Sequence, residues 1–135
     1  MDITLTSTAR RQAMAGALSL MASSVFAQVD AGLEGRRFEG VFIQRGKTSG
    51  DADTLTFNNG RFRSSACDRY GYSDASYRVT VQGDAIAFEA ETESPKYGKL
   101  HWKGVVRGDR LDATAMMQQS GKPPIENWVV AATPR

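Results

Sequence analysis

Three tight turns that each contain a glycine constrain the fold of this chain more than any other feature. Each turn separates two segments in which apolar and polar residues alternate, and the turns are Asn58-Asn59-Gly60, Gln82-Gly83-Asp84 and Arg107-Gly108-Asp109. An Asn-Gly pair between alternating segments is the strongest short-range signal of a β-hairpin, because a primed turn requires positive φ angles. The sequence therefore predicts antiparallel hairpins in series.

The alternation continues along the chain and predicts eight short strands. They are expected near residues 37–45, 54–57, 61–63, 77–81, 86–91, 100–106, 111–117 and 127–133. Residues 46–53, GKTSGDAD, are expected to form a loop, and no amphipathic helix is expected after residue 28. Short, evenly spaced antiparallel strands indicate a barrel or a sandwich. A meander of eight favours an all-β, antiparallel up-and-down barrel, because closure removes the exposed edges.

The inward face of such a barrel would be well supplied with apolar side chains. The residues expected to point inward are Leu55, Phe57, Phe62, Tyr77, Val79, Val81, Ile86, Phe88, Leu100, Trp102, Val106, Leu111 and Met117. Four small residues alternate with them, namely Ala90, Gly104, Ala113 and Ala115. These small residues either let the large side chains interdigitate or leave a cavity. An eight-stranded barrel is just wide enough for side chains or for one small ligand.

The N-terminus has the layout of a secretory signal peptide. Arg10 and Arg11 form a basic segment, residues 13–26 carry no charge, and small residues precede a cleavage point before Gln28. The apolar stretch is short for a bilayer span, which takes roughly 20 residues. Residues 1–27 are therefore expected to be a signal peptide helix and residues 28–135 a single β-barrel domain that is periplasmic or secreted. The alternatives are a retained anchor helix and, given the arginine pair, twin-arginine rather than general export.

Composition argues against several classes of partner. The formal net charge is +2, so nothing favours nucleic acid or an anionic membrane surface. No second apolar span follows the first, so no membrane span is expected in the mature chain. One cysteine excludes an intrachain disulfide, and one cysteine with one histidine makes a poor metal site. No cofactor is expected.

The segment SSACDRYGYSDASY, residues 64–77, holds the lone Cys67 in a chain expected to be exported. Three interpretations compete: a buried, inert residue at the end of the third strand beneath a loop carrying Tyr70 and Tyr72; a reactive or pairing thiol; and part of a ligand or metal site. Tyr97 lies in a second loop that could reach the same barrel end. The candidate ligand-binding residues are Cys67, Tyr70, Tyr72, Tyr97 and Trp102.

The opening Phe38-Glu39-Gly40-Val41-Phe42, followed by the meander, resembles the calycin barrels, the lipocalin and avidin group. Those families usually place a tryptophan two residues after the glycine, where this chain has Phe42. The segments DTLTFNNGRFRSSACDRYGYSDASY and SPKYGKLHWKG are also similar to small exported bacterial proteins of an uncharacterised family. The calycin resemblance implies a barrel with an interior ligand pocket, and it carries over no catalytic residue.

Two functional hypotheses follow. The first is a non-enzymatic periplasmic binding module for a small apolar or aromatic ligand or for an envelope protein partner. The second is a thiol-based redox protein or an enzyme that uses Cys67. A Cys67–His101 pair would need the two side chains within hydrogen-bond reach and an oxyanion site, and nothing in the spacing indicates this. The first hypothesis is therefore favoured.

Overall fold

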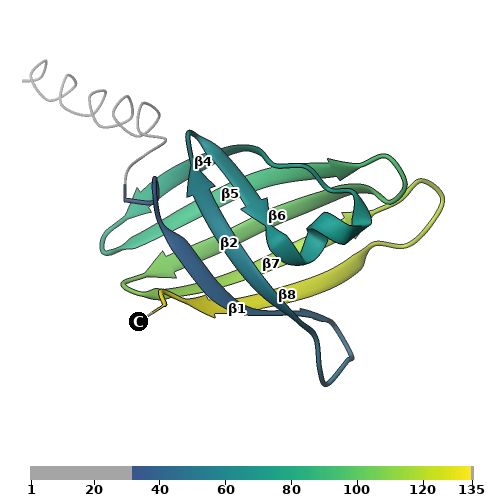
Figure 1. The fold of residues 1–135 in the computed structure, drawn as a ribbon, viewed down its shortest axis with the longest axis horizontal. Helices are drawn as coiled ribbons and strands as arrows, with labels where there is room; N and C mark the ends of the chain where they lie inside the picture. Colours follow the sequence, from purple (N-terminus) through teal and green to yellow (C-terminus); the bar gives the residue numbers. More distant parts are fainter. Residues whose placement is uncertain (1–31, 135) are drawn as a thin grey trace, which may run out of the picture.

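The computed structural model describes residues 32–134 (Figure 1). The expected signal peptide lies outside the described residues. The elements, in chain order, are the strands β1 (Arg37–Gln44), β2 (Asp51–Asn58) and β3 (Arg61–Ser64), the 3₁₀ helix η1 (Ser65–Tyr70), and the strands β4 (Ala75–Gln82), β5 (Ala85–Ser94), β6 (Gly98–Arg107), β7 (Arg110–Gln118) and β8 (Ile125–Ala132).

The strands form a closed barrel in which each pairs antiparallel with the next and β8 returns to pair with β1. Opposite Phe42 of β1, for example, lies Val129 of β8. In Figure 1, β1 and β2 cross in front of the longer strands β5 to β7. This confirms the expected eight-stranded up-and-down barrel, and the sandwich alternative is wrong.

The tight turns have the geometry that their sequences predicted. Asn59 and Gly60, between β2 and β3, have φ angles of 54° and 73°. Positive φ at both central positions is the mark of a primed hairpin turn, whose twist matches that of the flanking strands. The turn residues Gly83 and Gly108 also have positive φ angles, 62° and 59°.

An aromatic cluster fills the barrel. Phe57 lies at its centre, with ring centroids 5.3 Å from Phe62, 5.0 Å from Tyr77 and 5.1 Å from Phe88. Trp102 packs on Phe62 at 4.9 Å and is fully buried. These separations are typical of rings in direct contact.

The small residues of the last strands make room for these rings. Ala90 and Ala115 lie directly opposite Trp102 on its two neighbouring strands, and Gly104 lies opposite Phe88. Of the two alternatives left open by the sequence, interdigitation is the one observed around these side chains.

Both ends of the barrel are covered. At one end Leu33, in the turn of residues 32–35, is fully buried in the core. The carboxylate of Glu34 beside it accepts hydrogen bonds from the hydroxyl of Tyr77 and from the backbone N–H groups of Gly60 and Asn59, which lowers the Glu34 pKa. At the opposite end η1, the short coil in Figure 1, covers the opening with Ala66 and Cys67. The N-terminal turn and η1 therefore leave the core shielded from both sides.

Two expectations need correction. Strand β2 begins at Asp51, inside the segment expected to be a loop, because the Asp53 carboxylate finds enough hydrogen-bond donors to be buried. Val81 is 50% exposed rather than internal, because only Arg61 and Phe62 of β3 pair with β4 and no β3 residue lies beside Val81. Most of the other expected core residues are buried, while Ile86 and Met117 are partly so.

Among residues 32–134, no helix has the length and apolar character to cross a bilayer.

Replacing Gly104 with alanine should destabilise the barrel. A Cβ atom there would come within 2.8 Å of Phe88 Cζ and 2.9 Å of the Ala113 Cβ, and the Phe88 ring is held by its neighbours. Overpacking of this kind costs about 1–3 kcal/mol. Chemical denaturation should show this loss in Gly104→Ala, and a smaller additional loss when the same change is made in a Phe88→Leu background. Strictly additive losses would contradict a steric conflict between the two positions.

Candidate functional site

The residues expected to form a site divide between the end of the barrel and its core. Tyr70, at the end of η1, and Tyr97, in the loop between β5 and β6, form an edge-to-face pair with centroids 5.6 Å apart. The Ser94 hydroxyl donates to the Tyr70 carbonyl at 2.7 Å, which joins the two loops. The expectation that these loops share one barrel end is confirmed.

The other expected site residues are buried. Cys67 and Tyr72 are 4% and 7% exposed, and Trp102 is fully buried within the aromatic cluster, where its indole N–H donates to the Thr92 hydroxyl at 3.3 Å. Trp102 therefore contributes to the core, whereas Tyr70 is exposed and Tyr97 is half-buried against the core.

Cys67 lies within η1, past the end of β3, rather than at the end of the third strand as expected. Its sulfur is 3.4 Å from the Ser64 hydroxyl oxygen. Burial raises the pKa of the thiol to about 12. Because the thiolate is the nucleophilic form, a thiol that stays protonated at neutral pH is inert. His101 is on the outward face of β6, so it does not form a nucleophile–base pair with the buried Cys67.

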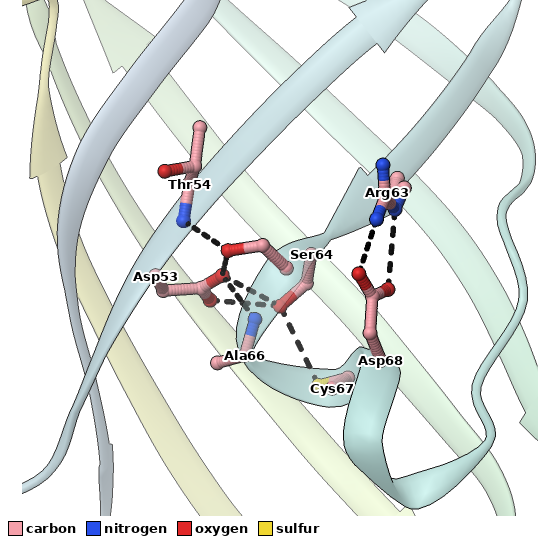
Figure 2. Close-up of polar contacts among 8 residues, drawn as sticks. Asp53, Thr54, Arg63, Ser64, Ala66, Cys67 and Asp68 are labelled. Atoms are coloured by element: carbon pink, nitrogen blue, oxygen red, sulfur yellow. Dashed lines mark hydrogen bonds and ion pairs between the residues drawn. The ribbon is translucent and has the colours of Figure 1, made fainter.

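A buried carboxylate that sequence reasoning missed fixes η1 to the barrel. Figure 2 shows Asp53 of β2 accepting hydrogen bonds from the Ser64 hydroxyl at 2.8 Å and from the Ala66 backbone N–H at 3.0 Å. Asp53 thereby serves as the cap of η1, whose own N-cap residue makes no such bond. The signal was present in the sequence, since Asp53 shares its strand face with Leu55 and Phe57.

The environment of Asp53 suits a structural role. Burial raises its pKa, and the hydrogen bonds partly oppose that effect. On the outside of η1, Arg63 pairs with Asp68, so the short helix is held on two sides (Figure 2). No group of three or more metal-ligating side chains occurs among the described residues. This cluster therefore closes the barrel end and offers neither a nucleophile nor a metal site.

A large hollow lies on the outer wall of the barrel. It has a volume of about 1200 Å³ and is lined by strands β4 to β8. Barrels built from twisted strands are hyperboloid in shape, so the outer wall is concave along the barrel axis. We call this hollow the outer groove. No residue in the expected site lines it.

A continuous row of outward side chains crosses the floor of the outer groove. Ala87, Val105, Asp112 and Val130 lie opposite one another on the successive strands β5, β6, β7 and β8. Three of the four are apolar, and Val130 is 50% exposed. The floor is therefore an apolar strip with one carboxylate.

Trp128 of β8 stands beside this strip and is 45% exposed. Its indole N–H donates to the Glu126 carboxylate at 3.0 Å, and Arg45 pairs with the same carboxylate at 2.8 Å. These contacts hold the ring in one orientation, and the hydrogen bond from Trp128 lowers the Glu126 pKa.

The charged residues in and beside the outer groove form ion pairs with one another. Glu89 pairs with Arg78 at 3.0 Å and with Lys103 at 3.8 Å, and Asp112 pairs with Arg110 at 3.0 Å. These three basic and two acidic residues leave an excess of one positive charge. The outer groove therefore combines an apolar floor, one exposed aromatic ring held by a hydrogen bond, and paired charges.

Cys67 should resist modification in the folded protein. At pH 8 a thiol reagent should label it slowly under native conditions and rapidly in denaturant, because the native thiol is buried and its pKa is raised. The rate can be followed by absorbance with a disulfide reagent. Native labelling as fast as that of an unfolded cysteine would restore the redox hypothesis.

Two substitutions of Asp53 should distinguish the contribution of its hydrogen bonds to stability from the contribution of its charge. Asp53→Ala leaves the Ser64 hydroxyl and the Ala66 N–H unpaired, which should cost about 1–3 kcal/mol in unfolding free energy. Asp53→Asn keeps an acceptor and removes the buried charge, so it should be much milder.

The pH dependence of the unfolding free energy shows whether the charge of Asp53 stabilises or destabilises the folded protein. Because the folded-state pKa of Asp53 is raised, its contribution to stability is fully present below the ordinary pKa of 3.8 and is lost as pH rises through the folded pKa. Asp53→Asn should therefore gain stability relative to the parent as pH rises across that window. Denaturation of both proteins at matched pH values measures the difference in their unfolding free energies. A stability of Asp53→Asn relative to the parent that falls as pH rises would contradict the raised pKa.

Comparisons with protein-family models, with curated proteins and with solved structures gave no match. The barrel and the geometry of its surface are therefore the basis for any proposal about function.

Proposed function

We propose that the chain is a non-enzymatic binding module of the cell envelope or the secreted space, and that it binds the apolar surface of a protein partner in the outer groove. The observation that carries this proposal is the combination of a filled interior with an apolar hollow on the outside. The export signal expected in residues 1–27 supports the location.

The packed interior favours a protein partner over a small ligand held inside the barrel. Calycin-like binding needs an open chamber, whereas here the rings of Phe57, Phe62 and Phe88 are in mutual contact and both barrel ends are covered. The outer groove exceeds the 300–1,000 Å³ typical of small-molecule pockets and lies open on the outer wall, so it would bury a small ligand only partly.

The composition of the outer groove fits a protein interface. Tryptophan is enriched among the residues that dominate binding energy, and Trp128 is already held by Glu126, so little side-chain freedom would be lost on binding. The apolar strip beside it would be covered by the partner, and the paired charges of Arg78, Glu89 and Lys103 lie on the cross-strand row that leads to Trp128. The partner surface that complements this arrangement is uncharged and apolar at its centre.

The thiol hypothesis has less support. A redox or catalytic cysteine needs an accessible thiolate, and Cys67 has a buried thiol with a raised pKa.

Site-specific photo-crosslinking tests the location of the interface. A photoreactive amino acid placed at Val105 or at Val130 should crosslink to the same partner in producing cells, because both positions line the outer groove. The control position is Thr56 of β2, whose side chain is on the outer face away from the groove. Equal crosslinking from Thr56 would contradict a binding surface on β5 to β8.

Substitution of Trp128 tests its energetic role with the partner so identified. Trp128→Ala should weaken binding at least about 30-fold, which is about 2 kcal/mol. The matched control is Tyr70→Ala, which removes an aromatic ring of similar exposure from the barrel end. Isothermal titration calorimetry gives both dissociation constants. A loss of affinity in Tyr70→Ala alone would show that the interface is at the barrel end and not on the outer wall. Saturable binding of the neutral dye Nile red, abolished by Trp128→Ala, would instead support a small apolar ligand.

A further inference from the structure

The closure of the barrel is weakest between β3 and β4. Strand β3 is the shortest, with four residues, and only two residue pairs join it to β4, Arg61 with Ser76 and Phe62 with Ala75. Strand β4 continues well beyond these pairs to Gln82. Its second half, residues 78–82, therefore pairs with β5 on one side and has no strand beside it on the other, within residues 32–134. We call residues 78–82 the β4 edge.

The backbone of the β4 edge has unused hydrogen-bonding capacity. In an antiparallel strand, the N–H and C=O groups point alternately to the two neighbouring strands, so about half of them point away from β5. Within residues 32–134, no turn residue, loop residue or side chain forms a hydrogen bond with the backbone of residues 78–82. The one polar side-chain contact, from Arg78 to Glu89, lies on the outer face.

The side chains leave this edge accessible. Val81 is 50% exposed although it alternates with the buried Val79, so the core face of the edge is only partly covered. Natural sheets usually protect an open edge with proline, a bulge or an inward-pointing charge. The β4 edge, RVTVQ, has none of these, because its one charged residue, Arg78, points outward.

We propose that the β4 edge receives an extended, apolar peptide segment of a partner protein as an added strand. The hydrogen bonds of such a strand would satisfy the free backbone groups, and its inward side chains would cover Val81. β-Branched residues at alternate positions of the peptide suit this role, because they would extend the core face of Val79 and Val81. The β4 edge borders the outer groove, which is lined in part by residues 78–80 and Gln82, but an added strand does not require Trp128.

The size of the edge favours a peptide over a second copy of the chain. Five residues of strand extend about 17 Å, at about 3.4 Å per residue. Two such edges paired together would bury much less than the roughly 1,000 Å² that a stable protein interface needs. A single extended peptide can bind such a short edge, because its backbone hydrogen bonds provide much of the affinity.

Hydrogen exchange of the full-length protein tests the proposal directly. The probe is an acetylated and amidated heptapeptide with the sequence Lys-Thr-Val-Thr-Val-Thr-Lys. The control peptide has the same sequence with N-methyl groups on alternate residues, which removes half of its backbone donors. At about 1 mM, a concentration suited to a weak complex, the probe should slow exchange at least tenfold for the amides of residues 78–82 that point away from β5, and the N-methylated peptide should not.

A protein variant and its matched control locate the effect. Val81→Lys places a charge on the core face of the edge and should abolish the protection. Val41→Lys should leave the protection intact, because Val41 is a similarly exposed valine on β1, which pairs with a strand on each side. Circular dichroism confirms that both variants remain folded, which the exposure of the two valines favours.

Four results would overturn the proposal. They are protection, before any peptide is added, of the amides in residues 78–82 that point away from β5, equal protection by the N-methylated peptide, no protection by the probe, and protection that grows with protein concentration alone. The last result would show that a second copy occupies the edge. Loss of binding at Trp128 would leave this proposal standing, and failure of the peptide experiment would leave the outer groove proposal standing.

Discussion

Ring-to-ring packing around Phe57 is the interaction on which the rest of the structure depends. An eight-stranded barrel encloses barely enough space for its own side chains, and here the rings of Phe62, Tyr77 and Phe88 all lie within 5.3 Å of Phe57 between centroids. A barrel filled in this way is rigid and has no chamber among these rings. The apolar side chains that the fold does not bury, such as Val81, Trp128 and Val130, are on the outer wall and at the edge of β4.

Two carboxylates close the ends of the barrel, and their pKa values shift in opposite directions for a clear reason. Asp53 is buried, so desolvation dominates and raises its pKa. Glu34 lies at the surface of the other end, so the hydrogen bonds that it accepts dominate and lower its pKa. Each carboxylate collects backbone N–H groups that would otherwise lack partners, those of Ala66 in one case and of Asn59 and Gly60 in the other.

The sequence predicted the architecture because local signals determine it. Positive-φ residues at Asn59 and Gly60 fix a hairpin, and strict alternation assigns inward faces without any knowledge of the third dimension. The outer groove was missed because it arises from curvature across five strands, and no local pattern joins Val105 to Val130. Trp102 was placed in a site because an aromatic residue in the core and one in a pocket look alike in sequence. Asp53 was missed because a polar segment suggests a loop until its hydrogen-bond donors are found in a distant segment.

The shortness of β3 links the closed end of the barrel to its open edge. Because the strand stops at Ser64, the following residues are free to turn into η1 and cover the opening with Cys67 and Ala66. The hairpin at Gly60 limits β3 at its other end, so the strand cannot follow β4 as far as Val81. To pair the β4 edge, β3 would have to extend past Gly60, and the hairpin to β2 prevents this. The two ends of this short strand therefore have separate consequences: one leads into the cap, and the other leaves residues 78–82 without a strand beside them.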